Sequence, residues 1–218
     1  GTQPTPVGSG AQTPSGGLSC VNIPGGFPFC AYATTAPAVG LFYCTDAACS
    51  SVNANTSFAT GNASTMEVSV AVRSDGKGGI VYEGATTGSV MYRSCTNPTG
   101  ATPCSTAGAE ATLAASGATG AGSSYMPAYG IAWVGTGASA KPLIAYSAAN
   151  ETFVYCSDDD CAATSSSSTA LSGARGISSM ITKPNGFAAF MTDNNTSLPY
   201  YHSCSDAACT TFEASNVT

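Results

Sequence analysis

The feature that most constrains this chain is a short cysteine-containing pattern that occurs four times. Its fullest copy runs from Tyr201 to Cys209 as Tyr-His-Ser-Cys-Ser-Asp-Ala-Ala-Cys. The other copies end at Cys49, Cys104 and Cys161, and the copy that ends at Cys104 has a longer gap between its cysteines. The first cysteines of successive copies are 51, 61 and 48 residues apart. This spacing indicates a repeat protein with units of about 40–50 residues plus insertions.

Each unit contains short runs of strand-forming residues separated by turn signals. In the second unit, the alternating run 68–72 is followed by a Gly-rich turn at 74–79 and by apolar runs at 80–82 and 90–92. Such runs predict antiparallel strands joined by hairpins. We therefore expect an all-β protein, a small β-propeller of about four four-stranded blades with disulfide-stapled hairpins. A β-sandwich is the alternative.

The repeat also predicts the domain organisation. Residues 1–17 are rich in Pro, Thr, Ser and Gly, which is typical of a flexible or O-glycosylated linker. The alternative is an arm that docks on the sheet edge of a neighbouring subunit. The remainder, 18–218, is expected to be a single β-repeat domain, with units at approximately 18–61, 62–120, 121–172 and 173–218.

Aligning the units on their first cysteine predicts which strand face is buried. The residue three places before it is large in every unit: Leu41, Tyr92, Phe153 and Tyr201. The residue two places before it is mixed in character: Phe42, Arg93, Val154 and His202. Because side chains alternate along a strand, the first set is expected to line one buried face.

The ten cysteines form five close pairs in the sequence, which favours disulfides in an oxidising compartment. A zinc site is the competing interpretation, but the chain has one histidine and the Cys-x4-Cys spacing is wider than a usual zinc knuckle. Sequence alone does not fix the connectivity, and local pairing is the simplest arrangement. The pairs are Cys20/Cys30, Cys44/Cys49, Cys95/Cys104, Cys156/Cys161 and Cys204/Cys209.

The motif Tyr-x-x-Cys-x-Asp-Ala-Ala-Cys, with an apolar-aromatic strand before it, resembles a class of secreted microbial repeat proteins predicted to be β-propellers. The resemblance covers roughly residues 18–218 and is weakest in the second unit. It implies the fold and an extracellular or cell-surface location, but no catalytic residues. Asn-x-Ser/Thr sequons agree with this location: they occur at Asn55, Asn62, Asn150, Asn194, Asn195 and Asn216.

Charge and hydropathy exclude some partners. The net charge is −6 with only six basic residues and no basic cluster, so nucleic acid is not an expected partner. No apolar run is long enough to span a membrane. Leu, Ile, Val and Phe make up about 15% of the chain, which suits thin β-structure rather than a helical core.

Few residues suggest chemistry. His202 occupies a variable strand position, which favours a structural role over a catalytic triad. Asp158, Asp159 and Asp160 could offer oxygens to Ca²⁺, but three adjacent carboxylates in a tight turn cannot all converge. Glu67 is the one carboxylate that adjoins a predicted inner strand, so it is the candidate for a glycosidase. An aromatic sugar platform could be formed by Trp133, Tyr125 and Tyr129, although Trp133 is more typical of a core residue.

These observations lead to the expectation of a protein that is not an enzyme. The leading hypothesis is a secreted, glycosylated structural subunit that self-assembles into an extracellular filament or surface layer, with copies joined through residues 1–17. The alternatives are a carbohydrate- or protein-binding propeller, with glycans as partners, and a glycoside hydrolase. We expect no catalytic residues, no metal and no cofactor.

Overall fold

The structure is a computed structural model, and it describes most of the chain. The described residues are 17–34, 38–61, 67–115, 129–148, 150–172, 176–177, 180–193 and 199–213. Most of the predicted arm at 1–17 lies outside them. Gly17 is described, and its carbonyl accepts a hydrogen bond from the Ala33 N–H at 3.1 Å.

The described strands form four antiparallel sheets of four strands, each built from strands consecutive in sequence. The first blade contains β1 (Leu18–Asn22), β2 (Pro28–Ala33), β3 (Ala38–Cys44) and β4 (Val52–Thr60). The second contains β5 (Val68–Val72), β6 (Gly78–Glu83), β7 (Val90–Cys95) and β8 (Ala111–Ala114). The third contains β9 (Tyr129–Val134), β10 (Lys141–Ser147), β11 (Asn150–Cys156) and β12 (Thr164–Ser172), with a 3-10 turn at Gly137–Ser139. The fourth contains β13 (Ile181–Thr182), β14 (Ala188–Asp193), β15 (Pro199–Cys204) and β16 (Phe212–Glu213).

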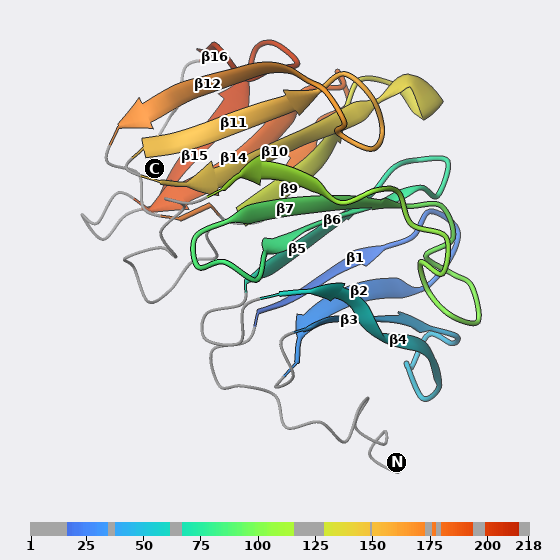
Figure 1. Ribbon diagram of the computed structural model, residues 1–218. Coiled ribbons are helices and arrows are strands. Elements are labelled where there is room, and N and C mark those ends of the chain that lie inside the picture. The colour runs from blue at the N-terminus through green and yellow to red at the C-terminus, as the bar shows by residue number, and fades with distance from the viewer. Residues whose placement is uncertain are drawn as a thin grey trace.

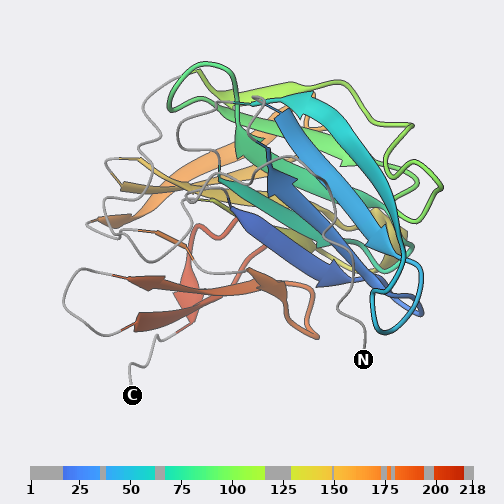
Figure 2. The same cartoon turned by 90° about the horizontal axis from the view of Figure 1, so that it is seen from below.

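The blades follow one another around a common axis. Strand β1 packs against β5, β5 against β9, and β9 against β13, so the first strand of each blade is the inner one. Figure 1 shows the order from β1–β4 at the bottom through β5–β8 to the third blade at the top, with the fourth blade behind the third, and Figure 2 shows the blades fanned rather than layered as two parallel sheets. The fold is therefore a small β-propeller, as predicted, and the β-sandwich alternative is wrong.

Short turns set the register of the inner hairpins. In the second blade, Arg73 N–H donates to the Lys77 carbonyl at 2.8 Å, and Gly76 between them has a φ of 89°. Only glycine adopts this φ without cost. Pairing then runs outward symmetrically from the turn, from Val72 opposite Gly78 to Val68 opposite Tyr82.

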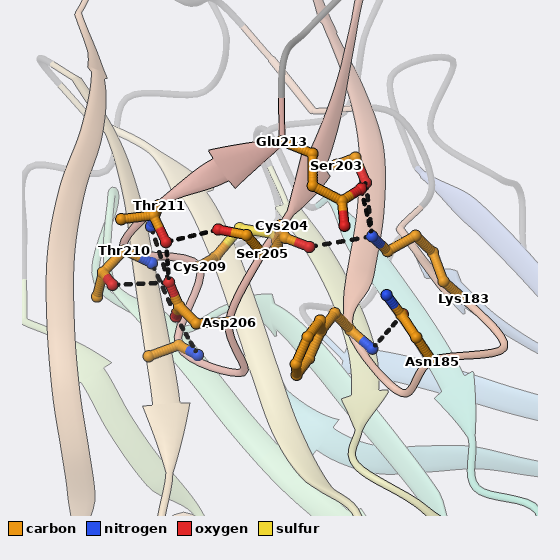
Figure 3. The surroundings of a disulfide bond; sticks show 12 residues. Lys183, Asn185, Ser203, Cys204, Ser205, Asp206, Cys209, Thr210, Thr211 and Glu213 are labelled. Atoms are coloured by element: carbon orange, nitrogen blue, oxygen red, sulfur yellow. Dashed lines mark hydrogen bonds and ion pairs between the residues drawn. A yellow bond between two sulfur atoms is a disulfide. The ribbon is translucent and has the colours of Figure 1, made fainter.

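The cysteine motif builds the turn between the third and fourth strands. Three copies have four residues between their cysteines, and in these the Asp two places after the first cysteine accepts hydrogen bonds. The donors are the backbone N–H groups two, four and five residues after the Asp, at 2.9–3.3 Å. The second cysteine then turns the chain with a φ between 52° and 56°, in all four copies. Figure 3 shows this arrangement around Asp206 and Cys209.

Each of the five disulfides joins two consecutive cysteines of the chain. The Cys20–Cys30 bridge differs from the other four in its position on the strands. Cys20 and Cys30 face each other directly across β1 and β2, with their Cα atoms 4.1 Å apart, so this bridge joins two paired strands. Cys20 is exposed, whereas Cys30 is 2% exposed and belongs to the core. The sequence pattern pairs Cys30 with Cys20 and does not predict its burial. The burial arises because β2 lies between β1 and β3 and is covered almost throughout.

The residue three places before the first cysteine of each motif is buried between blades, with one exception. Leu41, Tyr92 and Phe153 are 0% exposed, and each faces the following blade. Tyr201 is 44% exposed, so the prediction that it is buried is wrong. The physical reason is that, among the described residues, no further blade follows the fourth one to cover this face. Ile181 and Met191 are exposed on the same face, because strand pairing aligns Met191 with Tyr201 and Ile181 with Ala189.

No helix in the described part of the chain is long and apolar enough to cross a membrane.

Candidate functional site

The propeller has two ends with different chemistry. At one end lie the first hairpin turn of each blade and the cysteine turns, and we call this the disulfide end. At the opposite end lie the turns between the second and third strands and the entries to the inner strands. Two glutamates, Glu67 and Glu83, meet at this opposite end.

Glu67 and Glu83 are opposed across the hairpin of β5 and β6. The Glu83 N–H donates to the Glu67 carbonyl at 3.3 Å, which extends the ladder one pair beyond Val68 and Tyr82. Directly opposed residues of an antiparallel pair project to the same face, with Cβ atoms about 4.5–5.5 Å apart. The two carboxylates therefore share one face at the entry to an inner strand.

The two glutamates differ in accessibility. Glu83 is 4% exposed, and its Oε1 accepts from the Gly88 N–H at 2.8 Å, so the turn after β6 holds it. Glu67 is only partly buried. The pair thus combines a fixed, buried carboxylate with one that reaches solvent.

Tyr129 lies at the same place, at the start of inner strand β9 in the next blade. Its side chain is 2% exposed. Burial raises the pKa of Tyr129 well above its ordinary value, and the negative charges of Glu83 and then Glu67 raise it further. The phenol therefore keeps its proton beside the glutamate pair and can act only as a neutral group there.

A third glutamate, Glu151, lies at the same end as the pair but near the junction between the third and fourth blades. It is 0% exposed, and its Oε1 accepts from Ser147 Oγ at 2.8 Å and from the Gly176 N–H at 3.3 Å. No hydrogen-bond partner is described for its buried Oε2. Burial raises the pKa of Glu151, against the opposing effect of these two hydrogen bonds. The carboxyl connects the blades rather than lining an open site.

The three consecutive aspartates diverge, as expected. Asp158 holds its own turn, Asp160 accepts from Ser94 Oγ, and Asp159 accepts from three cations. The distances to Asp159 are 2.9 Å from Arg73, 3.0 Å from Lys77 and 2.9 Å from Lys141. Burial raises the pKa of Asp159, but the hydrogen bonds from these cations outweigh that effect and hold it well below its usual value. Among the described residues, no group of three His, Cys, Asp or Glu side chains could hold a metal ion.

His202 is a packed structural residue in the fourth blade. It is 7% exposed and stacks on Phe190 with ring centroids 5.2 Å apart, and its Nε2 lies 2.9 Å from Thr192 Oγ1. Burial lowers the pKa of His202. Its described hydrogen-bond partner is this threonine, so the geometry is not that of a catalytic triad.

The cysteines are structural rather than reactive. Every cysteine in the described part of the chain is in a disulfide, so none of them offers a thiolate nucleophile. Cys30 in particular is a buried core residue bonded to Cys20, two residue pairs from the turn between β1 and β2. The cysteines therefore support the scaffold and add nothing to the candidate chemistry.

The proposed aromatic platform is not assembled. Trp133 and Tyr129 lie at opposite ends of β9, and both are buried. Tyr125 lies outside the described residues. Instead, the Trp133 ring lies under the Arg73 guanidinium at 4.8 Å, and its indole N–H donates to the Ala71 carbonyl at 3.3 Å.

The glycosylation candidates fall partly on described residues. Asn55 is half-buried, and its side-chain amide donates to the Pro103 carbonyl at 3.0 Å. Asn150 begins β11. The other candidates lie outside the described part of the chain: Asn62, Asn194, Asn195 and Asn216.

Sequence reasoning selected Glu67 but missed Glu83 as its partner. The missing signal was the turn: a hairpin centred on Asp75 pairs residues at equal distances on either side. Counting outward from Arg73 and Lys77 places Glu83 opposite Glu67. The pair was therefore available from the sequence once the turn type was fixed.

Comparison with known proteins supports the fold. The sequence matches no protein-family model, and no curated protein is significantly similar to it. Several solved structures do match the fold. One is a GH43 glycoside hydrolase engineered to display both endo-xylanase and exo-arabinofuranosidase activity, with a TM-score of 0.55 at 10% identity over 96% of this chain and 43% of the other.

Two further solved structures match the fold at similarly low identity. An exo-β-1,3-galactanase from Clostridium thermocellum has a TM-score of 0.54 at 12% identity over 95% of this chain and 48% of the other. A structure from work on the GH130 family of mannoside phosphorylases, which contains glycoside hydrolases that target β-1,2-mannosidic linkages, has a TM-score of 0.52 at 9% identity. That match covers 92% of this chain and 69% of the other. This chain thus spans less than half of two of these structures.

These matches correct the functional expectation. The hypothesis of a non-enzymatic structural subunit of a filament or surface layer is wrong, because the three solved structures described above, which share this fold, come from glycoside hydrolases and a family of mannoside phosphorylases that contains them. The expectation that the chain is not an enzyme is wrong for the same reason. At this level of identity the matches define a β-propeller fold used by enzymes, and the chemistry has to come from the residues of this chain.

Proposed function

We propose that this protein is an extracellular glycoside hydrolase that cleaves glycosidic bonds at the pair formed by Glu67 and Glu83. The observation that carries the proposal is the cross-strand register that opposes these carboxylates at the entry to an inner strand. The fold shared with glycoside hydrolases supports it. The five disulfides support an oxidising, extracellular setting.

Two carboxyl groups are sufficient for this chemistry. One protonates the leaving oxygen, and the other either attacks the anomeric carbon or activates a water molecule. Retaining enzymes hold these groups about 5–5.5 Å apart, whereas inverting enzymes leave about 6.5–9.5 Å for the water. Directly opposed cross-strand residues bring their Cβ atoms about 4.5–5.5 Å apart, so both carboxyl groups can reach one bound sugar. We propose that the pair acts with retention of configuration, and the anomeric configuration of the first-formed product, read by NMR, tests this.

The environment assigns the roles. Glu67 reaches solvent and can exchange a proton with water between the two steps, so it is the acid and base. Glu83 is fixed by the Gly88 N–H and is the nucleophile. Tyr129 keeps its proton and can donate a hydrogen bond to the pair or to a sugar oxygen.

The test is turnover of a panel of glycans. Purified protein is assayed on xylan, arabinan, β-1,3-galactan and β-mannan, and on the matching nitrophenyl glycosides, with and without inorganic phosphate to detect phosphorolysis. Glu67→Gln and Glu83→Gln should each lower kcat by about 10²-fold or more. Glu110→Gln is the matched control, because Glu110 is an exposed glutamate of the same blade that accepts from Tyr82. Absence of turnover on every substrate, or undiminished activity in both pair variants, would contradict the proposal.

A further inference from the structure

A cavity opens at the disulfide end, where the first hairpin turns of all four blades meet. Its volume is about 410 Å³. The first blade contributes Pro24, the second Arg73 and Ser74, the third Trp133 and Thr136, and the fourth Lys183 with its neighbours. Pockets for small ligands typically have volumes of about 300–1,000 Å³, so this space suits one or two sugar residues.

The cavity is separate from the glutamate pair. Along β5, Glu67 precedes Arg73 by six residue steps, which is about 20 Å at the rise of a strand. A ligand in the cavity would therefore lie at the opposite end of the inner strands from the proposed catalytic groups.

The two cations in the cavity wall are already neutralised. Arg73 donates from Nε and Nη2 to Asp75, and from Nη1 to Asp159 and the Ala140 carbonyl, at 2.8–3.0 Å. Lys183 is equally engaged, since its Nζ donates to Ser203 Oγ at 2.6 Å, Glu213 at 2.9 Å and the Cys204 carbonyl at 3.0 Å (Figure 3). An ammonium group has three N–H donors, so Lys183 has none left for an anionic ligand.

The rest of the wall combines apolar surfaces with hydroxyl groups. Pro24, Pro184 and Trp133 are apolar, while Ser74, Thr136 and Thr182 carry hydroxyls. Thr182 Oγ1 donates to the Trp133 carbonyl at 2.7 Å and keeps its lone pairs as acceptors. Sugar rings present apolar C–H faces bordered by hydroxyls, and this wall offers groups of both kinds without a net charge.

We propose that this cavity is a second saccharide-binding site, specific for neutral sugars and distinct from the glutamate pair. It would hold a chain end or a short oligosaccharide at the far end of the propeller from the site of hydrolysis. Because all four blades contribute to the wall, bound sugar would also stabilise the relative positions of the blades.

Isothermal titration and NMR titration of the intact protein test this proposal directly. The ligands are neutral oligosaccharides of xylose, arabinose, galactose and mannose, with oligogalacturonate as the acidic comparison. At least one neutral series should bind, and oligogalacturonate should bind more weakly than the galactose series. Thr136→Gln, which fills the cavity, should weaken binding about tenfold or more. Ala138→Gln lies in the same turn but outside the cavity wall, and should have no effect.

Two further variants complete the test. Ser74→Gln fills the cavity from the second blade and serves if Thr136→Gln fails to fold. Glu67→Gln should leave sugar affinity at the cavity unchanged, because the glutamates are distant. The proposal is overturned if no neutral sugar binds at tens of millimolar, or if cavity-filling variants bind as well as wild type. It is also overturned if Glu67→Gln alone abolishes binding, which would place the sugar at the glutamate pair. The glycosidase proposal is judged separately by turnover.

Discussion

The third and fourth blades carry nearly the same cysteine motif but differ in how it is buried. Phe153 and Tyr201 occupy equivalent positions, three residues before the first cysteine of their turns. Phe153 is 0% exposed and packs on the fourth blade, with its ring 5.2 Å from Phe190 and 6.1 Å from Phe212. Tyr201 is 44% exposed. The motif therefore determines the hairpin, whereas the next blade determines whether the strand face is core or surface.

The cysteine turns of these two blades also differ in the contacts they make with other blades. Asp158 and Asp206 make equivalent bonds inside their turns. The residues that follow are Asp159 and Ala207. Asp159 reaches cations of the second blade, while Ala207 packs against the apolar cluster of the third and fourth blades. A shared turn geometry thus supports two kinds of contact, one ionic and one apolar.

The largest expected effect is at the aligned aromatic position. Phe153→Ala should lower the free energy of unfolding by about 3–5 kcal/mol, because it leaves a cavity between two blades. Tyr201→Ala should change it by only about 0.5 kcal/mol, as for an exposed site. Urea denaturation of both variants measures the difference. Similar losses would mean that the fourth blade is covered on this face in solution.

A second comparison concerns equivalent turn glycines. Gly186 has a φ of 85°, its carbonyl accepts from the Gly135 N–H at 2.7 Å, and an added Cβ would lie 3.0 Å from the Gly135 oxygen. Gly76 in the second blade has a similar φ of 89° but open space around it. Gly76→Ala should cost about 1 kcal/mol from backbone conformation alone. Gly186→Ala should cost about 2–3 kcal/mol, because the turns of two blades must also separate. Equal melting temperatures for the two variants would argue against the contact between the turns.

The ionic contact of the third blade should contribute less. Asp159→Asn removes the charge that pairs with Arg73, Lys77 and Lys141, and should cost about 1–2 kcal/mol. The cost should shrink in high salt, because the pairs are partly exposed. Glu213→Gln, which breaks the more exposed pair with Lys183, should have a smaller effect. Chemical denaturation at low and high salt measures the free energy of unfolding of both variants. An Asp159→Asn loss no larger than the Glu213→Gln loss would contradict this ranking.

The smallest effect is a pH dependence in the fourth blade. Because burial lowers the pKa of His202, the unfolded chain takes up a proton at higher pH than the folded protein does. Stability should therefore fall as the pH drops below about 6.5, the ordinary pKa of histidine. His202→Val, which installs the residue found at position 154 of the third blade, should remove this slope. The slope is measured by thermal melts at several pH values between about 5 and 8, which is the range in which histidine titrates.

Two groups provide the control for that measurement. Thr192→Val removes the contact to His202 Nε2 but keeps the imidazole, so the slope should persist. Glu151 acts in the opposite sense, because burial raises its pKa and its contribution is lost as the pH rises through that value. The difference between wild type and His202→Val therefore isolates the histidine. An unchanged slope in the His202→Val variant would assign it to another group.

Much of the fold was predictable because it depends on local sequence. The repeat, the alternating strands and the Asp-containing turns each use residues within a few positions of one another. The disulfides that the structure contains also join neighbours, and their spacing suits a single turn or hairpin. The register that opposes Glu67 and Glu83 was in principle predictable from the turn around Asp75.

The cavity at the disulfide end, the buried Cys30 and the exposed blade face were decided by tertiary structure. Tyr201 has the sequence context of a core residue and lies on the surface, because burial requires a neighbouring blade that no local pattern encodes. The cavity at the disulfide end takes its wall from turns between Pro24 and Gly186, which are far apart in sequence. The neutral character of that wall depends on ion pairs with partners up to 86 residues away. Hydrogen bonding within a hairpin is local and can be derived from sequence, whereas burial and charge compensation depend on which distant surfaces are brought together.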